Sequence, residues 1–220
     1  DPITGMTEGL LDRAQKDQVL PKIFYTNTSY EYYGRAASLM HTTLDGKADM
    51  PLGPTSRLYV MAGGNHGPGS FPPQTSRTTR YRNNANDWGW FNRGLLLAFQ
   101  RWLAEDKQPP PSVYPTVKNK ELVPLNQVRF PKLPGIQTPT RLHQVYRLDF
   151  GPDFRTRGIV THEPPKMGPP FGMLVPQVDA DGNDLAGLKT PQVAVPLATH
   201  TGWNLRNPAI GSPEELFSMT

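Results

Sequence analysis

Two side chains in the sequence have the types and positions needed for acid–base chemistry. His66 lies in a glycine-rich run, residues 63–69, directly after the apolar segment 57–62. Glu31 follows the β-rich segment 22–27 in a similar way. In open α/β sheets, ligands and catalytic groups gather beyond the carboxyl ends of the strands. A glutamate at that edge could orient a histidine held by the neighbouring strand and stabilise its imidazolium.

Each of these residues also has an ordinary structural explanation. A histidine between glycines can simply be a polar residue in a turn. A glutamate near the start of a helix is favoured by the helix dipole. Asp45 and Asp49 are alternative acids, but they lie in turn-like sequence rather than at a strand end. In one class of catalytic triad the serine comes first along the chain, the Asp or Glu second and the His last. An acid followed by a histidine fits the last two positions, which favours Glu31 with His66.

The elements that must position these side chains follow from the hydrophobic pattern. Strands are predicted over 22–27 and 57–62, and helices over 7–19, 33–41 and 91–104. The last helix has one apolar face, formed by Leu95, Leu96, Phe99, Trp102 and Leu103. Trp90 and Phe91 are predicted core residues, whereas Trp88 and Trp203 could each belong to the core or to a pocket. Strands alternating with helices indicate parallel α/β layering.

The proline and glycine content changes along the chain. The sequence has 25 prolines and 20 glycines, about a fifth of its 220 residues, which is too many for a helix bundle and too few for a disordered chain. Eight prolines fall within residues 109–139. Short β-like pieces then follow at 142–150, 172–178 and 192–197. We therefore predict an α/β part over 1–108 and a β-rich, Pro/Gly-rich extension over 109–220 that packs on it.

Composition and charge exclude several classes of function. The net charge of +4 comes from scattered basic residues, and no nucleic-acid-binding motif is present. No apolar run approaches the length of a membrane span. With no cysteine, thiolate metal sites and a cysteine nucleophile are excluded. Residues 179–184 resemble the start of a calcium loop but lack its later glycine and glutamate, so a turn is favoured. We predict no metal and no cofactor.

Several longer segments have a recognisable pattern. They are 22–32, 35–39, 57–69, 101–104 and 110–115, followed by 178–183 and 196–204. On these segments the chain resembles the bacterial "alpha/beta hydrolase domain" proteins, a branch of the α/β-hydrolase superfamily. The resemblance implies an α/β fold, the C-terminal half of a hydrolase sheet with flanking helices, followed by the irregular extension.

The resemblance also implies roles for individual residues. His66 is expected to be the catalytic base and Glu31 the acid of a Ser-His-Glu triad. Apart from the resemblance, we expect Asn65 and Trp88 to shape a pocket for a small ester or related acyl compound. The activity implied is that of a serine hydrolase of the esterase type. Compartment and oligomeric state stay open.

The nucleophile is where the sequence departs from the family pattern. Such hydrolases carry their serine on a G-x-S-x-G-like elbow between a strand and a helix. None of the eight serines, at 29, 38, 56, 70, 76, 112, 212 and 218, lies in such an elbow. We therefore expect the nucleophile upstream of Asp1, and the 220 residues alone to be inactive. The alternative is a hydrolase-fold remnant that serves as a binding or interaction module.

Overall fold

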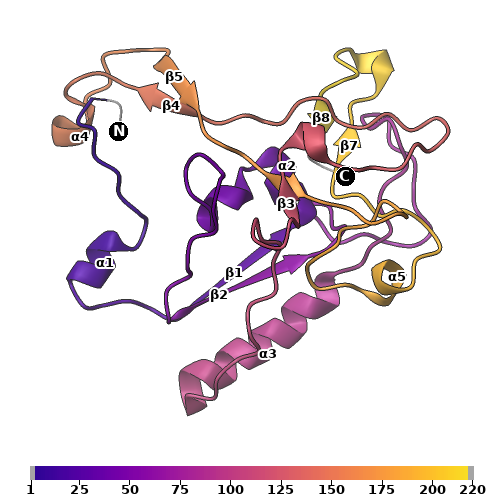
Figure 1. The fold of residues 1–220 in the computed structure, drawn as a ribbon, viewed down its shortest axis with the longest axis horizontal. Coiled ribbons are helices and arrows are strands. Elements are labelled where there is room, and N and C mark those ends of the chain that lie inside the picture. The colour runs from indigo at the N-terminus through magenta and orange to yellow at the C-terminus, as the bar shows by residue number, and fades with distance from the viewer. Residues whose placement is uncertain (1–2, 218–220) are drawn as a thin grey trace.

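Two parallel strands form the centre of the molecule. The computed structural model describes residues 3–217, and in it β1 (Ile23–Thr28) pairs with β2 (Ser56–Met61) (Figure 1). The register runs without interruption from Ile23 opposite Ser56 to Thr28 opposite Met61. Both strands match the predicted segments to within one residue. Their carboxyl ends therefore lie side by side at one edge of the sheet.

Strand β2 is buried on both faces, which its apolar sequence predicts. Side chains alternate between the two faces of a strand. Leu58 and Val60 pack into the larger hydrophobic cluster, while Tyr59 and Met61 pack into a smaller one on the opposite face. This central strand thus holds two layers together.

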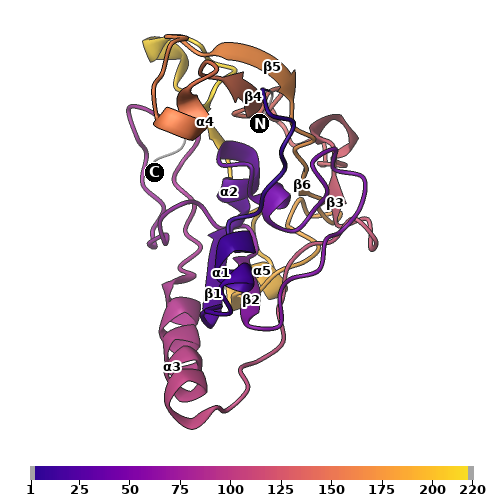
Figure 2. The ribbon, with the colours of Figure 1, turned by 90° about the vertical axis from the view of Figure 1, so that its left-hand side faces the viewer.

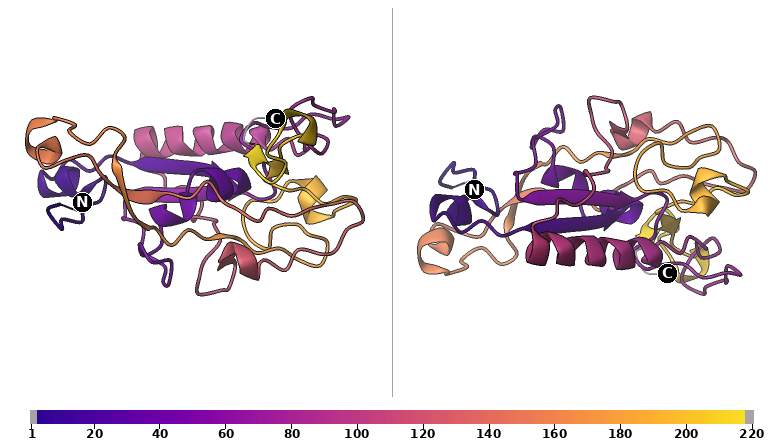
Figure 3. Two further views of the ribbon diagram at one scale, coloured as in Figure 1. Left: turned by 90° about the horizontal axis from the view of Figure 1, so that it is seen from above. Right: turned by 90° about the horizontal axis from the view of Figure 1, so that it is seen from below.

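The smaller cluster lies under the long helix α3 (Gly89–Glu105). Figure 3 shows this helix running along one face of the two strands, with much of the remaining chain on the other face. Leu95 and Trp102 are buried as predicted, and Phe99 contacts the Phe24 ring of β1 at 4.8 Å between centroids. At 17 residues α3 is the longest helix between residues 3 and 217, and no helix there is long and apolar enough to cross a bilayer.

The predicted apolar face of α3 is only partly buried. Leu96 is 67% exposed and Leu103 56% exposed, because a two-stranded sheet is too narrow to cover them. The prediction that Trp90 belongs to the core is wrong. Its side chain is 66% exposed, and the Arg93 guanidinium lies 4.5 Å from its ring centroid. Phe91 packs partly buried against the smaller cluster.

The second edge of β2 is covered by two short segments from the C-terminal half. Val113 forms a parallel bridge to Tyr59, and Leu188 forms one to Met61. The Val60 N–H donates to the Val113 carbonyl at 2.9 Å, and the Leu188 N–H donates to the Val60 carbonyl at 2.7 Å. Single residues from distant segments thus form hydrogen bonds with backbone groups of β2 that would otherwise pair with a further strand.

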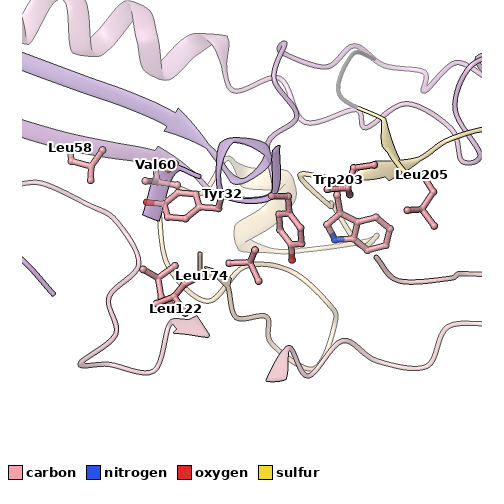
Figure 4. Close-up of a cluster of buried hydrophobic side chains, with 11 residues drawn as sticks. Tyr32, Leu58, Val60, Leu122, Leu174, Trp203 and Leu205 are labelled. Carbon is pink, nitrogen blue, oxygen red and sulfur yellow. The ribbon is translucent and has the colours of Figure 1, made fainter. Parts of the chain in front are cut away.

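The larger cluster combines side chains from both parts of the chain. Tyr32, Leu58 and Val60 pack with Leu122, Leu174, Val175, Trp203, Leu205 and Leu216 (Figure 4). Phe130 and Trp203 meet edge to face at 5.5 Å between centroids. Trp203, left open by the sequence, is thus a buried core residue. Residues 109–220, predicted to be an extension, supply much of this core. The division of the chain into an α/β part and an extension stays a prediction.

The remaining elements are short and are joined by loops (Figure 2). They are α1 (Asp12–Lys16), α2 (Ser29–Gly34), η1 (Ala37–Met40), β3 (Leu122–Val123), η2 (Leu125–Gln127), β4 (Tyr146–Asp149), α4 (Phe154–Arg157), β5 (Lys166–Pro170), β6 (Val175–Pro176), α5 (Pro191–Ala194), β7 (Asn204–Leu205), η3 (Pro208–Ile210) and β8 (Leu216–Phe217). Antiparallel pairs form between β3 and β6, β4 and β5, and β7 and β8.

Two of the predicted helices differ from those observed. The helix expected over 7–19 is reduced to α1, which buries none of its residues, because short helices need tertiary packing to persist. The helix expected over 33–41 is interrupted at Ala36, whose φ of +55° is left-handed. Helix α2 instead begins earlier, at Ser29, directly after β1. This earlier start brings Glu31 into the first helical turn.

The β-like pieces of the C-terminal half are only partly confirmed. Segment 142–150 contains β4 and segment 172–178 contains the two residues of β6. The strand predicted over 192–197 is wrong, because Pro191 starts the helical turn α5 after Thr190. Strand β5 escaped prediction because prolines punctuate it.

Truncating the core should cost far more stability than truncating the exposed side of α3. Leu58 is fully buried, so Leu58→Ala is expected to lower the free energy of unfolding by about 2–5 kcal/mol. Leu96→Ala, the matched control, should change it by less than about 0.5 kcal/mol. Urea unfolding followed by circular dichroism measures both values. Equal losses in the two variants would contradict this assignment of the core.

Candidate active site

The parallel pairing of β1 and β2 brings Glu31 and His66 together. Glu31 lies three residues beyond the end of β1, and His66 lies five residues beyond the end of β2. The His66 Nδ1 is 2.7 Å from Glu31 Oε1. The glutamate side chain is 14% exposed, while the histidine side chain is 58% exposed. The carboxylate is thus sheltered behind an imidazole that solvent can reach.

The other oxygen of Glu31 is fixed by the start of helix α2. The Thr28 backbone N–H donates to Glu31 Oε2 at 2.6 Å, and the Thr28 hydroxyl donates to the same atom. This is half of a capping box, in which a residue in the first turn reaches back to the residue before the helix. Because Oε2 is engaged by Thr28, Oε1 is held toward His66.

The loop that carries His66 turns sharply at two glycines. Gly63 has a φ of +62°, which glycine adopts without strain. Gly64 lies so close to Trp88 that an added Cβ would come within 2.9 Å of the indole Cδ1. The Trp88 Nε1–H donates to the Asn65 carbonyl at 3.1 Å. The buried tryptophan therefore fixes the backbone immediately before His66.

A buried carboxyl group ties the two sides of this site together. Asp184 Oδ2 accepts a hydrogen bond from the Gly63 N–H at 2.8 Å and another from the Ser29 hydroxyl. Ser29 lies two residues before Glu31, and Gly63 three residues before His66. Burial raises the pKa of Asp184 to about 6, although both hydrogen bonds act in the opposite direction. Sequence analysis did not single out Asp184, because its hydrogen-bond partners are more than a hundred residues away in the chain.

Two asparagines brace the same loop from the other side. The Asn84 amide donates to the Gly63 carbonyl at 2.6 Å and to the Thr201 carbonyl at 2.8 Å. The Asn86 amide donates to the Ala62 carbonyl at 2.9 Å. Side chains thus satisfy backbone groups that lie past the end of β2 and outside the sheet. Asparagines in a long loop gave no signal for this role in the sequence.

Asn65 lines a cavity of about 700 Å³ beside the loop. Its side chain is largely buried. Among the described residues 3–217, Trp88 is not one of those that line this cavity. It contacts the site through its hydrogen bond to the Asn65 carbonyl instead. The roles predicted for both residues in substrate binding stay predictions.

The alternative acids Asp45 and Asp49 have structural partners of their own. Asp49 accepts hydrogen bonds from the backbone N–H groups of Val117 and Lys118, both at 2.8 Å. Asp45 is exposed and accepts from the Thr43 hydroxyl at 2.6 Å. Neither aspartate forms a hydrogen bond to His66 in the described part of the chain. Of the acids considered, the structure brings Glu31 to the histidine.

Residues 179–184 form a turn, which explains their resemblance to a calcium loop. The Asp179 N–H donates to the Asn183 carbonyl at 2.8 Å, and Gly182 has a φ of +78°. The Asp179 carboxylate accepts from the backbone N–H groups of Asp181 and Asn183, both at 3.0 Å. Across residues 3–217, no three His, Asp or Glu side chains converge in the manner of a metal site.

Asp184 should make stability fall as the pH rises. In the folded chain the carboxyl keeps its proton up to a pKa of about 6, whereas the unfolded one ionises near pH 3.8. The folded state therefore binds more protons between pH 4 and 6, and loses about 3 kcal/mol of stability across that window. Asp184→Asn, which keeps an oxygen acceptor, should lack this loss.

Urea unfolding at several pH values, compared between wild type and Asp184→Asn, measures the effect. The comparison is needed because His41 acts oppositely: burial lowers its pKa to about 4, so stability falls as the pH drops from 6.5 to 4. His41 is present in both proteins and cancels in their difference. Parallel pH profiles would refute the role given to Asp184.

One comparison with known proteins identifies a family for this chain. The family model described as "Alpha/beta hydrolase domain" matches residues 3–217. No curated protein and no solved structure matches the chain. The family match shows that the chain belongs to the alpha/beta hydrolase domain family.

Proposed function

We propose that this chain supplies the base and the acid of a serine hydrolase that cleaves an ester or a related acyl compound. The observation that carries the proposal is the 2.7 Å contact between His66 Nδ1 and Glu31 Oε1 at the carboxyl ends of β1 and β2. His66 acts as the general base, and Glu31 orients it and stabilises the imidazolium. Membership of the hydrolase family supports this chemistry.

The proposal includes the position of the proton on the histidine ring. An ionised carboxylate only accepts, so Glu31 Oε1 requires the proton to be on His66 Nδ1. The second ring nitrogen, Nε2, is then the acceptor that takes a proton from a nucleophile. A side chain that is 58% exposed allows a nucleophile or substrate to approach. His66 then returns the proton to the leaving alcohol.

The nucleophilic serine is proposed to lie outside residues 1–220. Ser29, close to Glu31 in sequence, donates its hydroxyl to the Asp184 carboxyl group and accepts from the Gly63 N–H at 2.8 Å. In residues 3–217 no serine forms a hydrogen bond with His66. The 220-residue chain by itself is therefore expected to show no triad-type ester hydrolysis.

Removing the base should abolish ester hydrolysis by the complete protein encoded by the gene. His66→Ala is expected to lower kcat for p-nitrophenyl ester hydrolysis by at least about 10³-fold. His162→Ala is a matched control, because the His162 Nδ1 also lies near a carboxylate, 3.2 Å from Asp149. This control should retain wild-type activity. Retained activity in His66→Ala would refute the assignment of the base.

Changing the acid should alter catalysis more than substrate binding. Glu31→Gln keeps the side-chain shape but removes the charge, so kcat should fall by about 10²- to 10⁴-fold with a smaller change in KM. Steady-state kinetics of the complete protein and circular dichroism of the variant test this. An unchanged kcat would show that Glu31 only caps helix α2. A complete protein that has no serine elbow and no activity would favour a non-catalytic binding module.

A further inference from the structure

Large apolar side chains that would ordinarily avoid water gather around the cavity beside the His66 loop. The cavity measures about 700 Å³, within the range of small-molecule sites. Phe71 is 86% exposed, Val195 is 79% exposed and Leu197 is fully exposed, and all three line it. Exposed apolar side chains that gather around one cavity are typical of ligand-binding grooves and of interaction sites. Scattered exposed residues would need no such explanation.

Three loops that are distant in the sequence build this cavity. Asn65 and Phe71 come from the loop after β2, Phe130 and Ile136 from the proline-rich segment, and Leu197 from the segment after α5. The Trp203 ring, held by the larger hydrophobic cluster, forms another part of the lining. Asn65 belongs to this lining and directly precedes His66, so the cavity lies beside the loop that carries the proposed base, although His66 itself is not one of the lining residues.

The polar groups in the lining are mostly uncharged. The Asn84 amide is used by the carbonyls of Gly63 and Thr201, so its Oδ1 faces the His200 Nδ1 at 2.9 Å. A carbonyl oxygen only accepts, so Nδ1 carries the proton and Nε2 of His200 is left as an acceptor. Burial lowers the pKa of His200, which keeps the ring neutral at pH 7. The charged residue of the lining is Arg82, which is exposed.

We infer that this cavity binds the apolar chain of a neutral ester, with the ester group toward Asn65 and His66. This inference rests on the proposed function for the identity of the reacting group. The apolar lining favours a chain of several methylene groups, because moving each methylene group from water into the cavity strengthens binding. Arg82, an exposed side chain, is the charged group of the lining, and one such group compensates only part of the hydration that a dianionic substrate would lose.

Binding is tested on the complete protein carrying His66→Ala, so that the esters are not hydrolysed during the titration. The neutral fluorescent probe N-phenyl-1-naphthylamine is bound first and is then displaced with methyl butyrate, methyl hexanoate or methyl octanoate. The displacing affinity should rise about fourfold for each added methylene. Affinities that are independent of chain length would overturn the inference.

Variants identify the cavity as the place of binding. Leu197→Glu and Val195→Glu put a charge into the lining at exposed positions, and each should weaken probe and ester binding at least tenfold. Leu96→Glu makes the same change at the exposed side of α3, outside the cavity, and should bind as wild type. Phe71→Ala removes apolar surface without adding charge and should also weaken binding. It replaces a glutamate variant that fails to fold.

The outcomes separate the cavity from the catalytic proposal. Wild-type binding by the folded cavity variants would overturn the cavity inference, whatever the complete protein hydrolyses. Chain-length-dependent binding that is lost in the cavity variants supports the inference. If the complete protein then hydrolyses no ester, the proposed function fails while the cavity stands as a site for apolar chains.

Discussion

The parallel, in-register pairing of β1 with β2 is the constraint on which the candidate site depends. Thr28 lies opposite Met61, so the chain leaves both strands at the same edge of the sheet. Glu31 and His66 follow within a few residues and meet at 2.7 Å. A shift of one residue in the register would displace the chain by about 3.3 Å, more than the length of this hydrogen bond. The packing of β2 on both faces therefore fixes geometry as well as stability.

Two strands alone would leave the polar backbone around the site unsatisfied. Distant segments solve this with side chains: Asp184 binds the Gly63 N–H, and Asn84 binds the Gly63 carbonyl. The same Asp184 carboxyl accepts from Ser29, so one buried group connects the glutamate side and the histidine side. Burying a carboxyl group here is tolerated because it is hydrogen-bonded and can keep its proton.

The loops that brace the site also form the cavity beside it. Asn84 contacts both Thr201 and His200, and these two residues, with Asn84 itself, line the cavity. The proline-rich segment contributes Phe130, which packs on Trp203. The high proline and glycine content therefore belongs to ordered loops, since such residues fix turns without requiring regular elements. The proposed reaction centre and the proposed pocket for an apolar substrate group thus share one scaffold.

The two central strands, the long helix and the pairing of Glu31 with His66 could be predicted from local patterns, because runs of apolar residues and the glycines after them mark where strands end. The sequence could not determine that α3 leaves Leu96 exposed, that Pro191 starts a helical turn, or that Asp184 holds the His66 loop. Those features depend on which segments pack together, since burial and long-range hydrogen bonds override local propensity. Only the tertiary structure brings residues more than a hundred positions apart to one buried carboxyl group.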